Sequence, residues 1–125
     1  MPILYARQAP EFELSASARI TGLAAPSRGS AEVTTYRVRL DPGSAVTAHR
    51  HDHEEVFTLV AGSAMVVLDD EEYLLGPGDT VIVPPGTEHY AYSQTDHADF
   101  FAAVPVGTSF VVPDGDDRLL PDWGR

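Results

Sequence analysis

Residues 43–55 read GSAVTAHRHDHEE and contain three of the five histidines in the chain. Alternate residues of an extended segment share one face, so His49 and His51 direct two imidazoles toward the same point. Glu55 has the same parity and adds a carboxylate. Two imidazoles and a carboxylate suit a divalent transition metal that keeps open positions for water or substrate. This stretch therefore predicts a metal site.

A second stretch, residues 78–93, reads GDTVIVPPGTEHYAYS and supplies a further imidazole. His89 follows the tight turn Pro84-Pro85-Gly86 and stands at the start of another strand. It is the expected fourth partner of the site.

The surrounding sequence predicts an all-β fold. Gly and Pro, ten of each, interrupt every helical period, whereas Tyr36, Val38 and Leu40 alternate with arginines as in a half-buried strand. Many short strands separated by turns indicate a sandwich or barrel. The expected strands are 12–14, 20–24, 36–40, 56–61, 64–68, 73–75, 80–83, 90–93, 100–104 and 110–112.

At these residues the chain resembles the cupin superfamily. Gly43, His49, His51, Glu55 and Gly62 match its first motif, Gly-(X)5-His-X-His-(X)3,4-Glu-(X)6-Gly. The second motif, Gly-(X)5-Pro-X-Gly-(X)2-His-(X)3-Asn, is matched by Gly78, Pro84, Gly86 and His89, with Ser93 in place of Asn. The short spacer between the motifs resembles that of small microbial cupins.

The resemblance implies a jelly-roll barrel (double-stranded β-helix) in a single domain, 1–125. The barrel core is expected at about 31–105, with N-terminal strands in 1–30 and a C-terminal tail, 106–125, packing on the barrel or on a partner subunit. It also implies one divalent transition metal per chain (Fe, Mn, Zn, Ni or Cu) on His49, His51, Glu55 and His89. Small cupins commonly pair, so a homodimer is expected.

Composition excludes several chemistries. All eight basic residues are Arg, and Cys and Asn are absent as well as Lys. Schiff-base lysines, thiol nucleophiles, iron–sulfur clusters, disulfides and N-glycosylation are therefore impossible. A formal charge of -11 opposes nucleic-acid binding. No apolar run approaches the ~20 residues of a membrane span, so we expect a cytoplasmic protein with no membrane partner.

The remaining candidates have more ordinary interpretations. Glu55 and Tyr36 are the expected catalytic residues. Tyr36 is also expected to line the pocket, as an acid or a hydrogen-bond donor. Val38, Phe57 and Phe101 are expected as pocket or core residues, and His53 at the rim. We expect Glu54, His97 and the run 69–72 to be exposed to solvent. Arg37 and Arg39 are expected to face solvent or a partner subunit. Trp123 is expected to cover an apolar edge.

The sequence thus predicts a metal-dependent enzyme for a small, hydrophobic or aromatic substrate. Dioxygenase chemistry and isomerase or polyketide-cyclase chemistry both stay open. The alternative is a cupin that binds a metal or small ligand without turnover.

Overall fold

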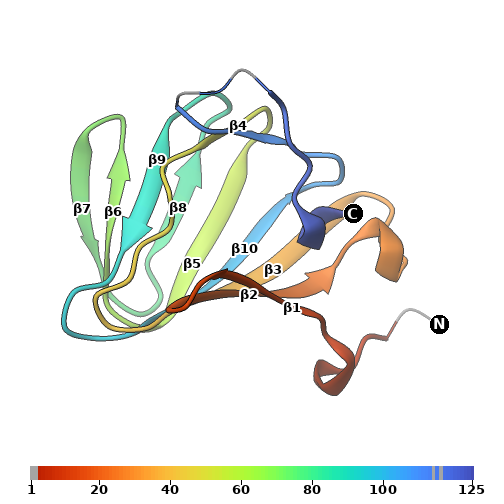
Figure 1. Ribbon diagram of the computed structural model, residues 1–125, viewed down its shortest axis with the longest axis horizontal. Coiled ribbons are helices and arrows are strands. Elements are labelled where there is room, and N and C mark those ends of the chain that lie inside the picture. The colour runs from red at the N-terminus through yellow and green to blue at the C-terminus, as the bar shows by residue number, and fades with distance from the viewer. Residues whose placement is uncertain (1–2, 114, 116) are drawn as a thin grey trace.

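The computed structural model describes residues 3–113, 115 and 117–125, which form antiparallel sheets and three short 3-10 helices. A six-stranded sheet has the order β1-β2-β3-β10-β5-β8, a three-stranded sheet the order β7-β6-β9, and β11 pairs with β4. Figure 1 shows the smaller sheet at the left and the large sheet curving from β8 near the centre to β2 and β1 at the lower right. The elements are η1 Ala6–Gln8, β1 Glu11–Ser15, β2 Ala18–Ala24, η2 Pro26–Arg28, β3 Val33–Leu40, β4 Arg50–His51, β5 Glu55–Gly62, β6 Ala64–Leu68, β7 Glu71–Leu75, β8 Thr80–Val83, β9 His89–Tyr92, β10 Ala98–Pro105, β11 Phe110–Val111 and η3 Asp122–Gly124.

Two facing sheets enclose one apolar core, so the predicted jelly-roll barrel is confirmed. Strand β3 shows why: Tyr36 and Leu40 are buried, while Arg37 and Arg39 lie on the other face. The smaller sheet is widened by the segment before β4, because Val46 N–H donates to Ala91 O and His49 pairs with His89. This pairing brings the two motif segments side by side.

Described segments from both the N-terminal and the C-terminal parts of the chain pack on the barrel. Strands β1 and β2 extend the large sheet beyond β3. The C-terminal segment runs beside β4 across one end of the barrel and finishes near β3 (Figure 1), where Trp123 packs against Phe12 and Tyr36. The same segment supplies part of the site described below.

Two turns illustrate local control of the fold. The β6–β7 hairpin turns at Asp69 and Asp70, which both have positive φ, as a tight hairpin turn requires. The acidic run 69–72 is exposed there, as predicted. At Gly62, φ is +82° and a Cβ would lie 1.8 Å from His97 O, so no other residue fits that bend without movement.

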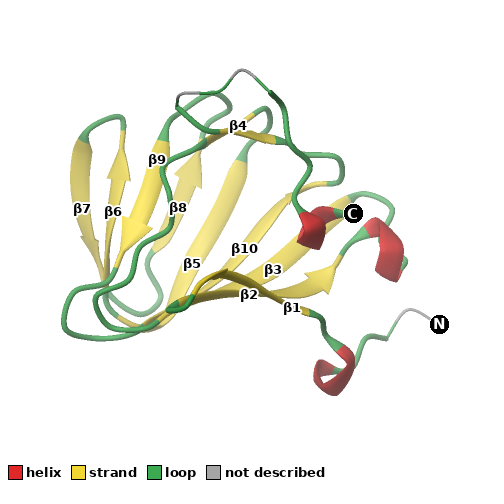
Figure 2. Cartoon of the chain, viewed as in Figure 1, coloured by secondary structure: helices red, strands yellow, loops and turns green. Residues whose placement is uncertain are grey.

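The strands match the expected ones with small shifts at their ends. One strand, β4, was not predicted because it is only two residues long and forms by pairing with the C-terminal segment. Figure 2 shows the helices as short pieces outside the sheets. Among the described residues no helix is long and apolar enough to cross a membrane.

Candidate metal centre

Four side chains converge at one point between the sheets: His49, His51, Glu55 and His89. Each can offer one ligand atom, and these atoms lie within 4.8 Å of one another. His51 lies on β4, Glu55 begins β5, His89 begins β9, and His49 pairs with His89 from the segment before β4. The residues predicted as a metal site are therefore brought together by two strand starts, one strand end and one loop.

Backbone carbonyls orient all three imidazoles. The Nδ1 atoms of His49, His51 and His89 lie 2.7 Å from Thr47 O, 3.2 Å from Ser109 O and 3.0 Å from Thr87 O, respectively. A carbonyl can only accept, so each Nδ1 carries the proton and donates it. Each Nε2 is then the atom that faces the centre, which is the arrangement that a ring nitrogen needs to ligate a metal.

Glu55 is held by its neighbours on both carboxylate oxygens. Tyr36 donates its hydroxyl proton to Oε2, and His89 Nε2 lies 3.1 Å from Oε1. His51 Nε2 is 3.5 Å from Oε2. Glu55 is 5% exposed and His89 is 3% exposed, so these polar groups meet away from bulk water.

The electrostatics of the metal-free site set the protonation of its groups. Burial lowers the pKa of His49 to about 4 and also lowers that of His51, so both rings are neutral near pH 7. Burial raises the pKa of Glu55, but the hydrogen bond with His89, the nearby His51 and His89 rings and the Tyr36 hydroxyl bring it down to about 2. Burial lowers the pKa of His89, but Glu55 raises it by more, so the pKa of His89 lies above its ordinary value. Burial and then Glu55 raise the pKa of Tyr36 well above its ordinary value, which keeps its proton in place.

This donor set fits a divalent transition metal. His51 Nε2 is buried and has no hydrogen-bond partner among the described residues, a costly arrangement unless another group binds it. Neutral His49 and His51 and an ionised Glu55 are in the states that ligation requires. Three imidazoles and one carboxylate suit Zn, Fe, Ni, Cu or Mn and leave positions for substrate.

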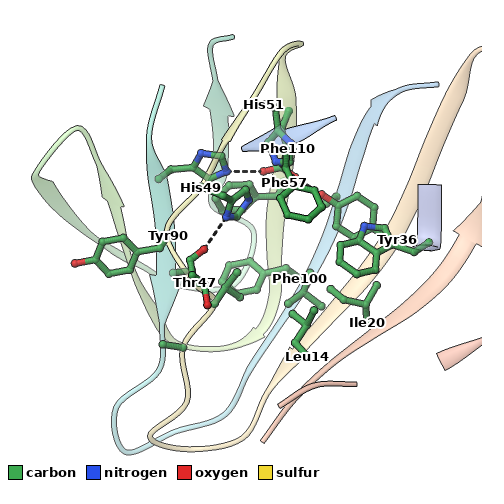
Figure 3. Close-up of a pocket in the computed structure, with 18 of the residues that line it drawn as sticks. Leu14, Ile20, Tyr36, Thr47, His49, His51, Phe57, Tyr90, Phe100 and Phe110 are labelled. Atoms are coloured by element: carbon green, nitrogen blue, oxygen red, sulfur yellow. Dashed lines mark hydrogen bonds and ion pairs between the residues drawn. The ribbon is translucent and has the colours of Figure 1, made fainter. Parts of the chain in front are cut away.

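The cluster lines one side of a cavity of about 350 Å³ between the sheets. That size lies at the lower end of the range for small-molecule sites. Its other walls are mainly apolar and aromatic, and no Arg is among the described residues that line it. Figure 3 shows Phe100, Ile20 and Leu14 on the side of the cavity away from His51. Twenty residues form the lining: Leu14, Ser15, Ile20, Tyr36, Val38, Ala45, Val46, Thr47, His49, His51, Glu55, Phe57, His89, Tyr90, Ala91, Phe100, Ala102, Phe110, Val112 and Trp123.

Three of the expected pocket residues, Tyr36, Val38 and Phe57, line this cavity. Two other residues do not line it: Phe101, whose expected pocket or core position was wrong, and His53, which was expected at the rim. Phe101 is 45% exposed on the outer face of β10, where it packs beside Arg37. His53 is exposed and contacts Asp52 instead, because the chain turns outward between β4 and β5.

Other residues near the site were missed by sequence reasoning. Phe100 takes the inward position assigned to Phe101, since it shares the face of Tyr36 and Val38 across the sheet. Phe110 comes from the C-terminal segment, and Leu14 and Ile20 from the N-terminal strands. Only their apolar character was visible beforehand, because strand pairing decides which of them turn inward.

The remaining expectations concern the surface. Glu54 and His97 are exposed, as predicted. Arg37 is not free in solvent: its guanidinium binds the carboxylate of Asp99, with Nε 2.7 Å from Oδ1. Trp123 packs on the apolar edge formed by Phe12 and Tyr36, as expected, and also reaches the cavity.

Comparison with known protein families matches residues 36–104 to the cupin domain. The match spans more than half of the chain, which therefore belongs to the cupin family and is a small cupin. An uncharacterized protein of Methanocaldococcus jannaschii is 35% identical over 48 residues, which are 38% of this chain and 38% of that protein. The match thus spans about two fifths of the relative's length.

Solved structures share the fold. An RmlC-like cupin from Shewanella frigidimarina has a TM-score of 0.71 at 22% identity, covering 82% of this chain and 87% of the other. The polyketide cyclase RemF from Streptomyces resistomycificus has a TM-score of 0.76 at 18% identity, covering 98% of this chain and 88% of the cyclase chain. Salicylate 1,2-dioxygenase from Pseudoaminobacter salicylatoxidans has a TM-score of 0.72 at 17% identity, covering 82% of this chain and 30% of the dioxygenase chain. At such identities these similarities concern the fold alone.

Proposed function

We propose that this cupin is a metal-dependent enzyme acting on a small hydrophobic or aromatic organic molecule. The observation that carries the proposal is the position of the four ligand atoms, within 4.8 Å of one another, on the wall of an apolar cavity. A molecule in that cavity places its polar atoms beside the ion and its carbon skeleton against aromatic side chains. The ligands of the single ion are His49, His51, Glu55 and His89.

A divalent ion bound there would polarise a carbonyl or enol, or activate dioxygen. The chain itself does the rest. Carbonyls of Thr47, Ser109 and Thr87 fix the imidazoles, Tyr36 holds Glu55 in one orientation, and the apolar walls exclude water. The described lining holds two phenols, Tyr36 and Tyr90. The proton of Tyr36 is engaged by Glu55, so Tyr36 acts by orienting Glu55.

The cavity chemistry supports an apolar substrate over a phosphorylated one. A phosphate would need Arg or Lys in the wall. The chain has no Lys, and within the part of the chain that the structure describes no Arg lines the cavity. The names of the similar structures include both a cyclase and a dioxygenase, so both reaction classes remain candidates for this site.

The test begins with the metal content of the purified protein, followed by incubation with a panel of hydroxylated aromatic acids and ketones. An oxygenase consumes oxygen in step with product and is inactive with Fe(II) under nitrogen. An isomerase or cyclase works under nitrogen with Zn, Ni or Mn. His49→Ala should lose metal and turnover together, while His97→Ala, which removes an exposed histidine, should change neither.

Turnover retained by a metal-free His49→Ala protein would overturn metal catalysis. A wild-type protein that holds metal and binds the panel but returns every compound unchanged would instead be a binding cupin without catalysis.

A further inference from the structure

The C-terminal residues Ser109–Val112, here called the strap, lie against the metal centre. Phe110 pairs with His51 and Val111 with Arg50, so the strap lies alongside the strand that carries a ligand. Figure 1 shows it crossing the same end of the barrel as β4. The strap lies outside residues 36–104, the part matched to the cupin domain.

The strap forms part of the substrate cavity. Phe110 and Val112 both line it. The Phe110 ring meets the His49 ring edge-on, with centroids 6.4 Å apart and an interplanar angle of 83°. Figure 3 shows Phe110 beside His51 and Phe57. A planar group that binds at the metal position through an oxygen atom would therefore lie next to the Phe110 ring.

One residue of the first motif fastens the strap. Asp52 Oδ1 accepts the Ser109 N–H at 2.8 Å, and the Ser109 carbonyl oxygen accepts a hydrogen bond from His51 Nδ1 at 3.2 Å. Asp52 also lies 3.0 Å from His53 Nδ1 and 3.5 Å from Arg118 Nη1. Strand β11 is two residues long, and Phe110 also exchanges two backbone hydrogen bonds with Leu119, at 2.9 and 3.0 Å. The Asp52 contact adds to these bonds by fastening the residue before Phe110.

We propose that the strap selects planar aromatic substrates, with Phe110 as the specificity-determining residue and Asp52 as a positioning residue that acts through the strap. The inference rests on the proposed metal-dependent function and names its substrate class. An aromatic ring gains a ring-to-ring contact with Phe110 that a small inorganic ligand does not reach. A mobile strap would remove this contact even with Phe110 present.

The test uses the full chain loaded with Co²⁺, whose absorption reports the ligand field. Two probes are titrated: 4-nitrocatechol, which is planar and aromatic, and azide, which is small. Phe110→Ala should weaken 4-nitrocatechol binding about tenfold and leave azide affinity within about twofold. Asp52→Ala should give the same pattern, and the double variant should lose no more than Phe110→Ala alone.

The matched control is Asp52→Asn, whose side-chain oxygen still accepts the Ser109 N–H and which should stay within about twofold of wild type. Hydrogen exchange at Ser109–Val112 should be at least about tenfold faster in Asp52→Ala than in Asp52→Asn. This readout tests the strap without the metal chemistry, and melting temperatures show that each variant is folded.

Wild-type affinity for 4-nitrocatechol in Phe110→Ala, or additive losses in the double variant, would overturn the inference while leaving the metal site intact. An Asp52→Ala protein that loses Co²⁺ together with the probe would show that Asp52 acts on His51 and would overturn its role through the strap. A wild-type chain that fails to bind Co²⁺ would overturn the proposed function itself.

Discussion

Ser93 shows how a serine serves at a motif position where asparagine is usual. It stands where the second cupin motif has Asn, and it is 4% exposed. Its Oγ donates to Asp41 O at 2.7 Å and accepts the Ser44 N–H at 3.1 Å. The serine therefore fastens the loop that leads to His49. This role needs one hydrogen-bond donor and one acceptor, and a single hydroxyl supplies both.

Replacing Ser93 with Ala should destabilise the fold. The change removes both hydrogen bonds of the buried hydroxyl, while the Ser44 N–H keeps its bond to Asp41 O at 3.1 Å, so the loss is about 1–2 kcal/mol. Urea unfolding of metal-free protein measures this loss. Ser27→Ala, at an exposed serine, should stay within about 0.5 kcal/mol, and an equal loss in both variants would contradict the role of Ser93.

Thr34 is a buried hydroxyl that the fold leaves unsatisfied. It is 2% exposed, and its Oγ1 has no hydrogen-bond partner among the described residues. Thr34→Val keeps the branched shape and removes the desolvated hydroxyl, so we expect a gain of about 1 kcal/mol in unfolding free energy. A loss of stability in urea unfolding would instead place a water in the adjacent cavity of about 10 Å³, lined by Thr34, Tyr36 and His51.

At the scale of the element, strand β10 shows how pairing decides which side chains face the site. Phe100 and Phe101 are adjacent, and either could point inward. Ala102 pairs with Tyr36 on one side and Phe57 on the other, so the even-numbered residues of β10 share the cavity face. Phe100 is 3% exposed as a result, and Phe101 is 45% exposed.

The two phenylalanines should therefore respond very differently to truncation. Phe100→Ala leaves a cavity next to Phe57, with which it makes a T-shaped contact, and should cost about 3–5 kcal/mol. Phe101→Ala removes an outward ring and should cost about 1 kcal/mol or less. Thermal and urea unfolding compare the pair, and equal losses would contradict the observed face assignment.

At the scale of the whole molecule, the metal site joins parts that are distant in sequence. Its ligands lie in both sheets, with Glu55 on β5 of the large sheet and His89 on β9 of the smaller one. An ion that binds only the folded chain adds its binding energy to the stability of the barrel. The metal should therefore brace the two sheets against each other.

Removing the metal with a strong chelator should lower the melting temperature. At a free ion concentration one hundred times the Kd, the contribution is about 2.7 kcal/mol, which corresponds to at least about 5 °C for a chain of this size. Differential scanning calorimetry with and without chelator measures it. His49→Ala should melt at one temperature in both conditions, and an unshifted wild type would mean that the barrel binds no metal.

Local patterns in the sequence were enough for the class of fold and for the ligand set. Alternation in strands such as β3, together with frequent Gly and Pro, leads to antiparallel sheets, because side-chain direction in a strand is a local property. Motif spacing identified His49, His51, Glu55 and His89, which the structure brings within ligating distance. These features depend on residues close together in the chain or on a recognisable motif.

Only the tertiary structure decided the rest of the site. The inward turn of Phe100, the anchoring of the strap by Asp52, and the bond from Tyr36 to Glu55 each depend on contacts between segments far apart in sequence. Register between strands is fixed by the packed core as a whole, and a shift of one residue exchanges the two faces. The sequence by itself therefore determined the barrel and its candidate metal ligands, whereas long-range pairing decided which side chains form the substrate cavity.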